Sequence, residues 1–292
     1  MVFELMELNL YEWIRGRRSN TPENKVKYYM HQLLKSIDHM HRNGIFHRDI
    51  KPENVLLSTD SLKLADFGSC RGIYSRQPFT EYISTRWYRP PECLLTDGYY
   101  SYKMDIWGVG CVFFEVLALC PLFPGKNELD QVHKIHNILG TPPPEILQKF
   151  QKKASHMDFN FPKQEGSGFT QLIPHVSAEA KDLISKMLTY IEEDRITARQ
   201  ALQHPYFRDI RENEKVTSNL PTPTLPAPTA DRAAGIMPNI TKLPHIIKPK
   251  HLANKQKKSI TYDQKSIMAR GNPILKPKVS PYSQKHFYQS YY

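Results

Sequence analysis

A cluster of polar residues occupies the segment "GIFHRDIKPENVLL", residues 44–57, with apolar residues on both sides. A solvent-exposed loop has no need of apolar flanks, and a core segment has no use for five polar side chains. These side chains belong to His47, Arg48, Asp49, Lys51 and Asn54. Together they offer a carboxylate, an amide oxygen and cations, which can hold a charged ligand and accept a proton from a hydroxyl group.

A second carboxylate, Asp66, follows two short apolar runs. The runs "NVLLS" and "LKLADF" are separated by the turn-like "STDS", so they predict a small β-hairpin. Across this hairpin Asn54 and Asp66 could face one site, and their oxygens are hard ligands that suit Mg²⁺. Asp49 could then face a substrate hydroxyl, while Lys51 supplies a point charge for a phosphate. Phosphoryl transfer requires these parts.

Several helices must position this hairpin. Residues 20–44 predict a helix with an apolar face, with Thr21 as its cap and Pro22 in its first position. Residues 102–120 are apolar around nearly the whole circumference, which is typical of a helix at the centre of a domain. Further helices are predicted in residues 128–140, 177–188 and 197–205. The sequence therefore predicts a mainly helical α+β fold with a small hairpin beside the polar cluster.

Four motifs resemble the signature set of eukaryotic protein kinases, in order and at the family's spacing. They are "HRDIKPEN", "DFG", "PPE" and "DIWGVG", and the resemblance runs from Met1 to about Phe207. The segment "TEYISTRWYRPPECLLTDG" further resembles the CMGC group, in its MAK-like branch. The resemblance implies a serine/threonine kinase that uses ATP and Mg²⁺. One departure is Pro90, where most relatives have alanine.

The resemblance assigns chemical roles to four residues. Asp49 resembles the catalytic base and Lys51 the residue that contacts the transferred phosphate. Asn54 and Asp66 resemble the two Mg²⁺ ligands.

Five further residues resemble structural supports of this site. His47 and Phe67 resemble packed residues that hold the loop. Asp105 resembles the acid that binds the catalytic-loop backbone. Glu92 and Arg195 resemble a buried ion pair that fixes the substrate-binding segment.

The "TEY" sequence resembles a doubly phosphorylated switch at Thr80 and Tyr82, and an upstream activating kinase is implied. Each phosphate adds nearly two negative charges and binds arginine, for which Arg48, Arg71 and Arg89 are candidates. Arg89 also resembles the residue associated with a preference for proline after the target Ser/Thr. Protein substrates containing Ser/Thr-Pro are therefore implied.

The first residues, "MVFELMELNLYEWI", resemble the segment that joins the two kinase lobes. By this resemblance Glu4 and Met6 offer backbone groups to adenine, Asn9 lies near the ribose, and Leu56 forms the floor of the adenine site. The domain division is then a hinge remnant at residues 1–9, a kinase C-terminal lobe at 10–208 and a tail at 209–292.

The family's G-x-G-x-x-G loop and V-A-I-K lysine do not occur in the 292 residues. We therefore expect the N-terminal lobe to be absent, and the chain alone to transfer phosphate poorly or not at all. Either Met1 is an internal start of a full kinase, as in a short isoform or an incomplete gene model, or a non-catalytic binding lobe is made on purpose. The intact catalytic set favours the first interpretation.

The positive charge of the chain is concentrated in its tail. The formal net charge is +11, and residues 209–292 hold 14 Lys/Arg against five Asp/Glu. Together with "LPTPTLPAPTA", this composition predicts a disordered tail, which is either simply solvated or bound to an acidic partner. Nucleic-acid binding is the less favoured alternative. Four cysteines without metal-like spacing and no apolar run long enough for a membrane span favour a cytoplasmic or nuclear location, and the resemblance also implies the cilium.

Overall fold

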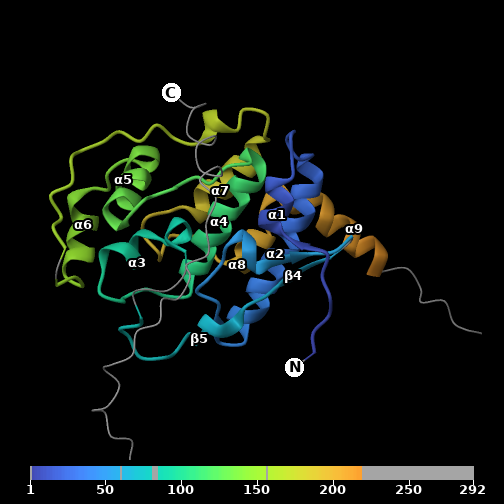
Figure 1. Ribbon diagram of the computed structural model, residues 1–292, viewed down its shortest axis with the longest axis horizontal. Coiled ribbons are helices and arrows are strands. Elements are labelled where there is room, and N and C mark those ends of the chain that lie inside the picture. The colour runs from blue at the N-terminus through green and yellow to red at the C-terminus, as the bar shows by residue number, and fades with distance from the viewer. Residues whose placement is uncertain (1, 60, 81–84, 156, 219–292) are drawn as a thin grey trace, which may run out of the picture. The chain divides into compact units, whose positions relative to one another are not determined.

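The computed structural model describes residues 2–59, 61–80, 85–155 and 157–218. Its α-helices are α1 (Leu10–Arg15), α2 (Glu23–Arg42), α3 (Pro91–Leu95), α4 (Lys103–Ala118), α5 (Glu128–Leu139), α6 (Pro144–Gln151), α7 (Ala178–Met187), α8 (Ala198–Leu202) and α9 (Arg208–Ser218). Its strands are β1 (Leu8–Asn9), β2 (Ile45–Phe46), β3 (Val55–Leu57), β4 (Leu62–Leu64) and β5 (Arg71–Gly72). For these residues the prediction of a mainly helical α+β fold is confirmed (Figure 1).

The predicted hairpin forms between β3 and β4. These strands pair antiparallel, with Val55 opposite Leu64 and Leu57 opposite Leu62. On the other side of β3, β1 adds a third strand. A separate pair, β2 with β5, joins the two ends of the stretch that contains the polar loop, the hairpin and the segment after the hairpin.

Helix α4 lies at the centre, with α5 and α6 on one side of it and α1, α2 and α9 on the other (Figure 1). Every residue of α4 from Lys103 to Leu117 is buried, as its apolar circumference predicts. It packs against α2 and α7, while α2 also packs against α8.

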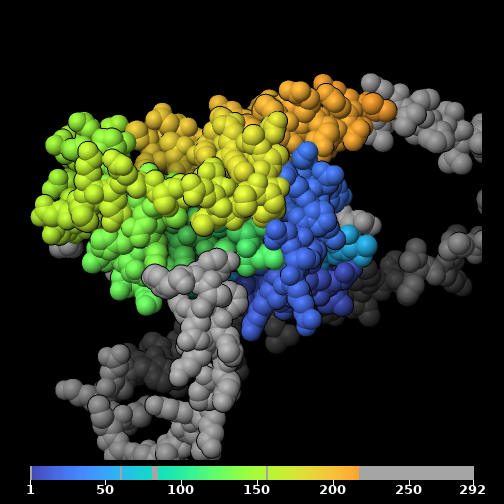
Figure 2. Space-filling model, turned by 90° about the horizontal axis from the view of Figure 1, so that it is seen from above, coloured from blue at the N-terminus to red at the C-terminus, as the bar shows by residue number. Residues whose placement is uncertain are grey.

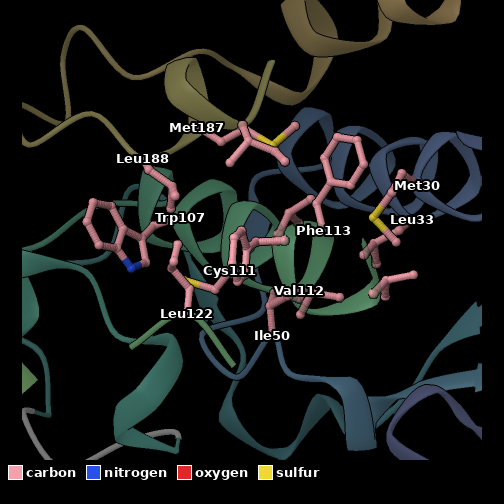
Figure 3. Close-up of a cluster of buried hydrophobic side chains, with 14 of the residues drawn as sticks. Met30, Leu33, Ile50, Trp107, Cys111, Val112, Phe113, Leu122, Met187 and Leu188 are labelled. Carbon is pink, nitrogen blue, oxygen red and sulfur yellow. The ribbon is translucent and has the colours of Figure 1, made fainter. Parts of the chain in front are cut away.

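The contact between α2, α4 and α7 forms the main core (Figure 3). Met30 and Leu33 of α2 lie near Phe113 of α4, and Met187 of α7 lies on the opposite side of Phe113 (Figure 3). All four side chains have no exposed surface. This packing gives the neighbouring loops a rigid support.

One residue of the polar loop is anchored in this core. Ile50 follows Asp49 in the chain, is 3% exposed and points toward Val112 (Figure 3). A Cβ atom at Gly108 of α4 would lie 2.9 Å from the Ile50 Cβ and 3.2 Å from its carbonyl oxygen. The lack of a side chain at Gly108 therefore allows the loop to approach the helix closely.

Helix α2 begins differently from the prediction. Its N-terminal cap is Pro22, which provides no side-chain hydrogen bond, while Thr21 is buried. Gly44, just beyond the helix, has φ +74°, a conformation that favours glycine.

The tail was predicted to begin at Asp209, yet α9 continues to Ser218. Ion pairs join Lys27 of α2 to Asp209 (3.0 Å) and Lys35 of α2 to Glu214 (3.2 Å). Figure 2 shows α9, in orange, against the N-terminal part of the chain, in blue. These partners lie far away in sequence, so the local composition of the helix does not reveal them.

The remainder of the predicted tail, residues 219–292, lies outside the described residues. Within the described residues, no helix combines the length and the apolar character that a membrane span requires.

Candidate active site

The polar loop between β2 and β3 is held by one buried carboxylate, Asp105 of α4. Its two oxygens accept hydrogen bonds from the backbone N–H groups of His47 and Arg48, each at 2.8 Å. The ring of His41, from α2, lies 2.9 Å from the same carboxylate. Arg48 has φ +71°, so these bonds fix a backbone conformation that non-glycine residues seldom adopt. The predicted contact between Asp105 and the loop backbone is present.

The loop brings three of the predicted chemical groups together. The Lys51 ammonium lies 2.9 Å from Oδ2 of Asp49, and Asn54 Nδ2 donates to the same oxygen at 3.0 Å. Asn54 Nδ2 also donates to the Asp49 carbonyl oxygen at 2.8 Å. Since both amide hydrogens are directed at Asp49, the Asn54 Oδ1 atom is left to act as a ligand.

The hairpin brings Asp66 to this cluster. The backbone N–H of Ala65 donates to the Asn54 carbonyl oxygen at 2.9 Å, which fixes the residue before Asp66 against the loop. Asp66 itself has φ +63° and accepts from the Gly68 N–H at 3.3 Å. The hairpin therefore brings the backbone at Ala65, next to Asp66, against Asn54. That the Asn54 and Asp66 side chains face one site stays a prediction.

The donor set fits Mg²⁺. A carboxylate from Asp66 and an amide oxygen from Asn54 are hard ligands, and Mg²⁺ commonly binds one or two protein oxygens while water and substrate phosphates complete its shell. Among the described residues, no group of three or more His, Cys, Asp or Glu side chains could hold a metal by itself.

His47 and Phe67 contact each other but differ in burial. His47 is fully buried, and its Nε2 lies 2.9 Å from the Ala65 carbonyl oxygen. The two rings pack edge to face with centroids 5.6 Å apart. Phe67 is nevertheless 57% exposed, so within the described residues it is packed on one side only.

The segment before α1 lies beside the hairpin. Asn9 is opposite Leu56 in the β1–β3 pair, and the Glu7 N–H donates to the Leu57 carbonyl at 3.1 Å. Asn9 Oδ1, however, accepts from the Glu12 N–H at 2.9 Å, which caps α1. The role near a ribose, inferred by resemblance, therefore competes with a structural role that the sequence analysis missed.

The other two predicted nucleotide residues lie in the same segment. The Glu4 carboxylate forms an ion pair with Lys63 of β4, so its side chain is engaged by the hairpin. Met6 is half-buried.

The three candidate phosphate-binding arginines have different neighbours. Arg48 Nη1 donates to the Tyr100 hydroxyl at 3.0 Å, and Arg71 lies across from Phe46 in the β2–β5 pair. Arg89 instead lies 3.2 Å from Oε1 of Glu128, at the start of α5. Thr80 is among the described residues, whereas the predicted switch residue Tyr82 lies outside them.

The predicted ion pair between Arg195 and Glu92 is present. Arg195 donates to both Glu92 oxygens, at 2.7 and 2.9 Å, and both side chains are almost fully buried. Lys103 lies beside this pair, and its ammonium donates to the carbonyl oxygens of Glu192 and Arg195. Burial lowers the pKa of Lys103. No pattern in the sequence indicates the contact of Lys103 with this pair.

A second buried contact joins the substrate-binding segment to α4. Tyr88 donates from its hydroxyl to Glu115 Oε2 at 2.8 Å. Burial raises the pKa of Glu115 to about 7, although the hydrogen bond from Tyr88 opposes this rise. Burial also raises the pKa of the Tyr88 phenol. The sequence analysis missed this pair because its members are 27 residues apart.

We predict that Glu115→Gln changes the pH dependence of stability. The ordinary pKa of Glu115 is 4.5 and rises to about 7 on folding, so the native state keeps a proton that the unfolded chain releases. This stabilisation is present below pH 4.5 and is lost as the pH rises toward 7. Over that range wild-type stability should fall relative to the variant by up to about 3 kcal/mol.

Urea unfolding of both proteins between pH 4 and 8 measures this difference. Burial lowers the pKa of His136 to about 4, so this residue makes the free energy of unfolding rise with pH. Wild type and variant share this contribution, which therefore cancels when the two are compared. A difference between the two proteins that does not vary with pH would contradict the assignment.

Comparison with known proteins identifies the class of protein to which this fold and this site belong. The family model for the protein kinase domain matches residues 1–207, so the chain belongs to the protein kinase family.

Among curated proteins, the chain resembles MAPK/MAK/MRK overlapping kinase. It is 59% identical to the Homo sapiens protein over 215 residues, which cover 74% of this chain and 51% of the relative. The Mus musculus protein is 58% identical over 217 residues, with the same coverage. Serine/threonine-protein kinase MAK of Mus musculus is 43% identical over 208 residues, covering 71% of this chain and 33% of that relative. These relatives support the MAK-like branch of the CMGC group, and the chain spans about half the length of the first two.

Proposed function

We propose that the chain is the C-terminal lobe of a serine/threonine protein kinase, which transfers the γ-phosphate of ATP to protein hydroxyl groups. The observation that carries the proposal is the contact of Asp49 with Lys51 and Asn54, to which the backbone of Ala65, the residue before Asp66, is hydrogen-bonded. A purely structural loop has no need of a buried carboxylate, an amide oxygen and an ammonium group at one place.

Each of these side chains has a defined task. Asp49 accepts the proton of the substrate hydroxyl, and Lys51 contacts the phosphate that is transferred. Asn54 and Asp66 would hold Mg²⁺. A bound magnesium ion would neutralise phosphate charge. The backbone groups of Glu4 and Met6 would bind adenine, and Leu56 would form the floor of the adenine site.

The substrates we propose are proteins with proline after the target Ser/Thr. Arg89 is 6% exposed and engaged by Glu128, while the neighbouring Trp87 Nε1 donates to the Gly125 carbonyl at 2.9 Å. These contacts attach the segment after the switch to the start of α5, which supports a fixed surface for the residue that follows the target. We further propose phosphorylation of Thr80 and Tyr82 by an upstream kinase.

Transfer of label from ATP to a pair of peptides, Ser-Pro and Ser-Ala, tests this proposal. We expect the 292-residue chain to label the Ser-Pro peptide preferentially, and only with Mg²⁺ present. Its rate should lie below the ordinary range of about 1–100 s⁻¹, because the sequence has no glycine-rich loop to cover the phosphates. Equal labelling of both peptides would contradict proline direction, and turnover in the ordinary range would contradict the expected weak transfer.

The alternative function is protein binding without phosphoryl transfer. One observation favours it: an open groove of about 460 Å³ between α2 and β4, lined in part by apolar residues. Its apolar lining comes from Met40, Leu62, Leu64 and Phe67. If binding is the function, neither peptide is labelled. Phe67→Ser should then weaken the association with purified proline-directed kinases, while Asp49→Asn leaves it unchanged.

A further inference from the structure

Thr80 and the residues just before it contact one tyrosine, Tyr100, through both its side chain and its backbone. The Tyr100 hydroxyl donates to the Thr80 carbonyl oxygen at 2.7 Å. The Gln77 side-chain amide donates to the Tyr100 carbonyl oxygen at 2.6 Å. Between them the ring of Phe79 packs on the Tyr100 ring, with centroids 5.3 Å apart. Tyr100 has no exposed surface, so these contacts exclude water.

The backbone of the same segment is also fixed. The Phe79 N–H donates to the Gly98 carbonyl oxygen at 2.8 Å. Gly98 has φ +82°, and a Cβ atom at this position would lie 2.1 Å from the Phe79 carbonyl oxygen. Glycine is therefore required for the segment to approach the Tyr100 loop this closely.

The same tyrosine hydroxyl also binds Arg48. It accepts from Arg48 Nη1 at 3.0 Å, while Arg48 Nε donates to the Ser69 carbonyl oxygen at 2.5 Å. The Tyr100 hydroxyl is thus hydrogen-bonded both to the Arg48 guanidinium and to the Thr80 carbonyl oxygen. It therefore keeps these two groups close to each other. Arg48 is in turn fixed by Asp105 through its backbone.

We propose that Tyr100 is a positioning residue for a phosphate on Thr80. Its hydroxyl holds the Thr80 backbone beside the Arg48 guanidinium before the phosphate is added. The phosphate then meets a cation that is already in place and does not have to order the segment first.

The tyrosine contact and the phosphate contact are compatible. Tyr100 binds the carbonyl oxygen of Thr80, whereas the phosphate is added to the side chain. A guanidinium group has five N–H donors, and the described residues receive hydrogen bonds from only its Nε and Nη1. Charge-assisted bonds to a phosphate can therefore form while the Tyr100 bond remains. The two contacts should stabilise each other.

This inference rests on the proposed switch at Thr80. It is tested with the full chain, made with threonine or with phosphothreonine at position 80. Hydrogen exchange of the Phe79 and Thr80 amides is measured in wild type and in Tyr100→Phe, which keeps the ring in its apolar surroundings. Tyr99→Phe is the matched control, because it removes a hydroxyl from the same loop. Exchange of the α4 amides reports whether the fold is retained.

Without phosphate, we expect Tyr100→Phe to speed exchange of the two amides by about three- to tenfold, through loss of one buried hydrogen bond. In wild type and in Tyr99→Phe, the phosphate should slow exchange by about tenfold or more. In Tyr100→Phe it should slow exchange by less than about a third of that factor. Equal slowing in wild type and Tyr100→Phe would overturn the proposed role of Tyr100 and would leave the Thr80 switch in place. No slowing in wild type would overturn the Thr80 switch itself, and this inference with it.

Discussion

Glu92→Gln is expected to lower the free energy of unfolding by about 3–5 kcal/mol, since it removes one partner of a buried ion pair. The Arg195 guanidinium has no exposed side-chain surface and the Glu92 side chain is 3% exposed. Glutamine keeps the size of the side chain but not its charge. The guanidinium would remain buried with its positive charge uncompensated.

The surroundings of Arg195 explain why the protein cannot relax around this change. Its Nε and Nη2 donate to the Thr189 carbonyl oxygen at 3.1 and 3.0 Å, and its Nη1 donates to the Lys103 carbonyl oxygen at 3.0 Å. These bonds hold the guanidinium in place, so it cannot turn to water. The buried Lys103 ammonium adds a second positive charge nearby.

Urea unfolding of the variant and of wild type measures this effect. Lys186→Met is the matched control, because it breaks an ion pair with Asp182 in which both side chains are about half exposed. Such a surface pair should contribute less than about 0.5 kcal/mol. A Glu92→Gln effect as small as that of the control would show that the buried pair does not hold the segment.

The sequence predicts those parts of the site that lie close together along the chain. Asp49, Lys51 and Asn54 lie within six positions, and one hairpin brings Asp66 to them. Two apolar runs and a turn between them were sufficient to infer the hairpin. Resemblance to a family added the partner of Glu92, which lies 103 residues away.

Contacts between distant polar residues could not be predicted in this way. The bonds of Tyr100 to Arg48 and Thr80 span 52 and 20 residues, and no local pattern indicates them. Likewise α9 is polar, and its pairing with α2 depends on charges about 180 residues earlier. Periodicity reports which face of a helix is apolar, but it does not report which polar partners meet.

Asp49→Asn is expected to reduce phosphoryl transfer by about 10²–10⁴-fold, the usual contribution of a general base. Asparagine has nearly the same volume and cannot accept the hydroxyl proton. The Asn54 bond to the carbonyl oxygen at position 49 involves the backbone, so the loop should keep its shape. The loss should therefore appear in the rate of transfer and not in the stability of the fold.

Label transfer with the chain in excess over a Ser-Pro peptide, followed for hours, allows a slow rate to be measured. Asp38→Asn, on α2, is the control: that carboxylate pairs with Arg42 at 2.8 Å, outside the site, and its loss should leave transfer unchanged. Binding of Mg²⁺-ATP, measured separately, should be retained in Asp49→Asn because Asn54 and Asp66 are intact. A variant that transfers phosphate as fast as wild type would show that Asp49 does not accept the proton. The contact between Asp49 and Lys51 would then serve only to shape the loop, since an ammonium group beside a carboxylate is equally compatible with that role.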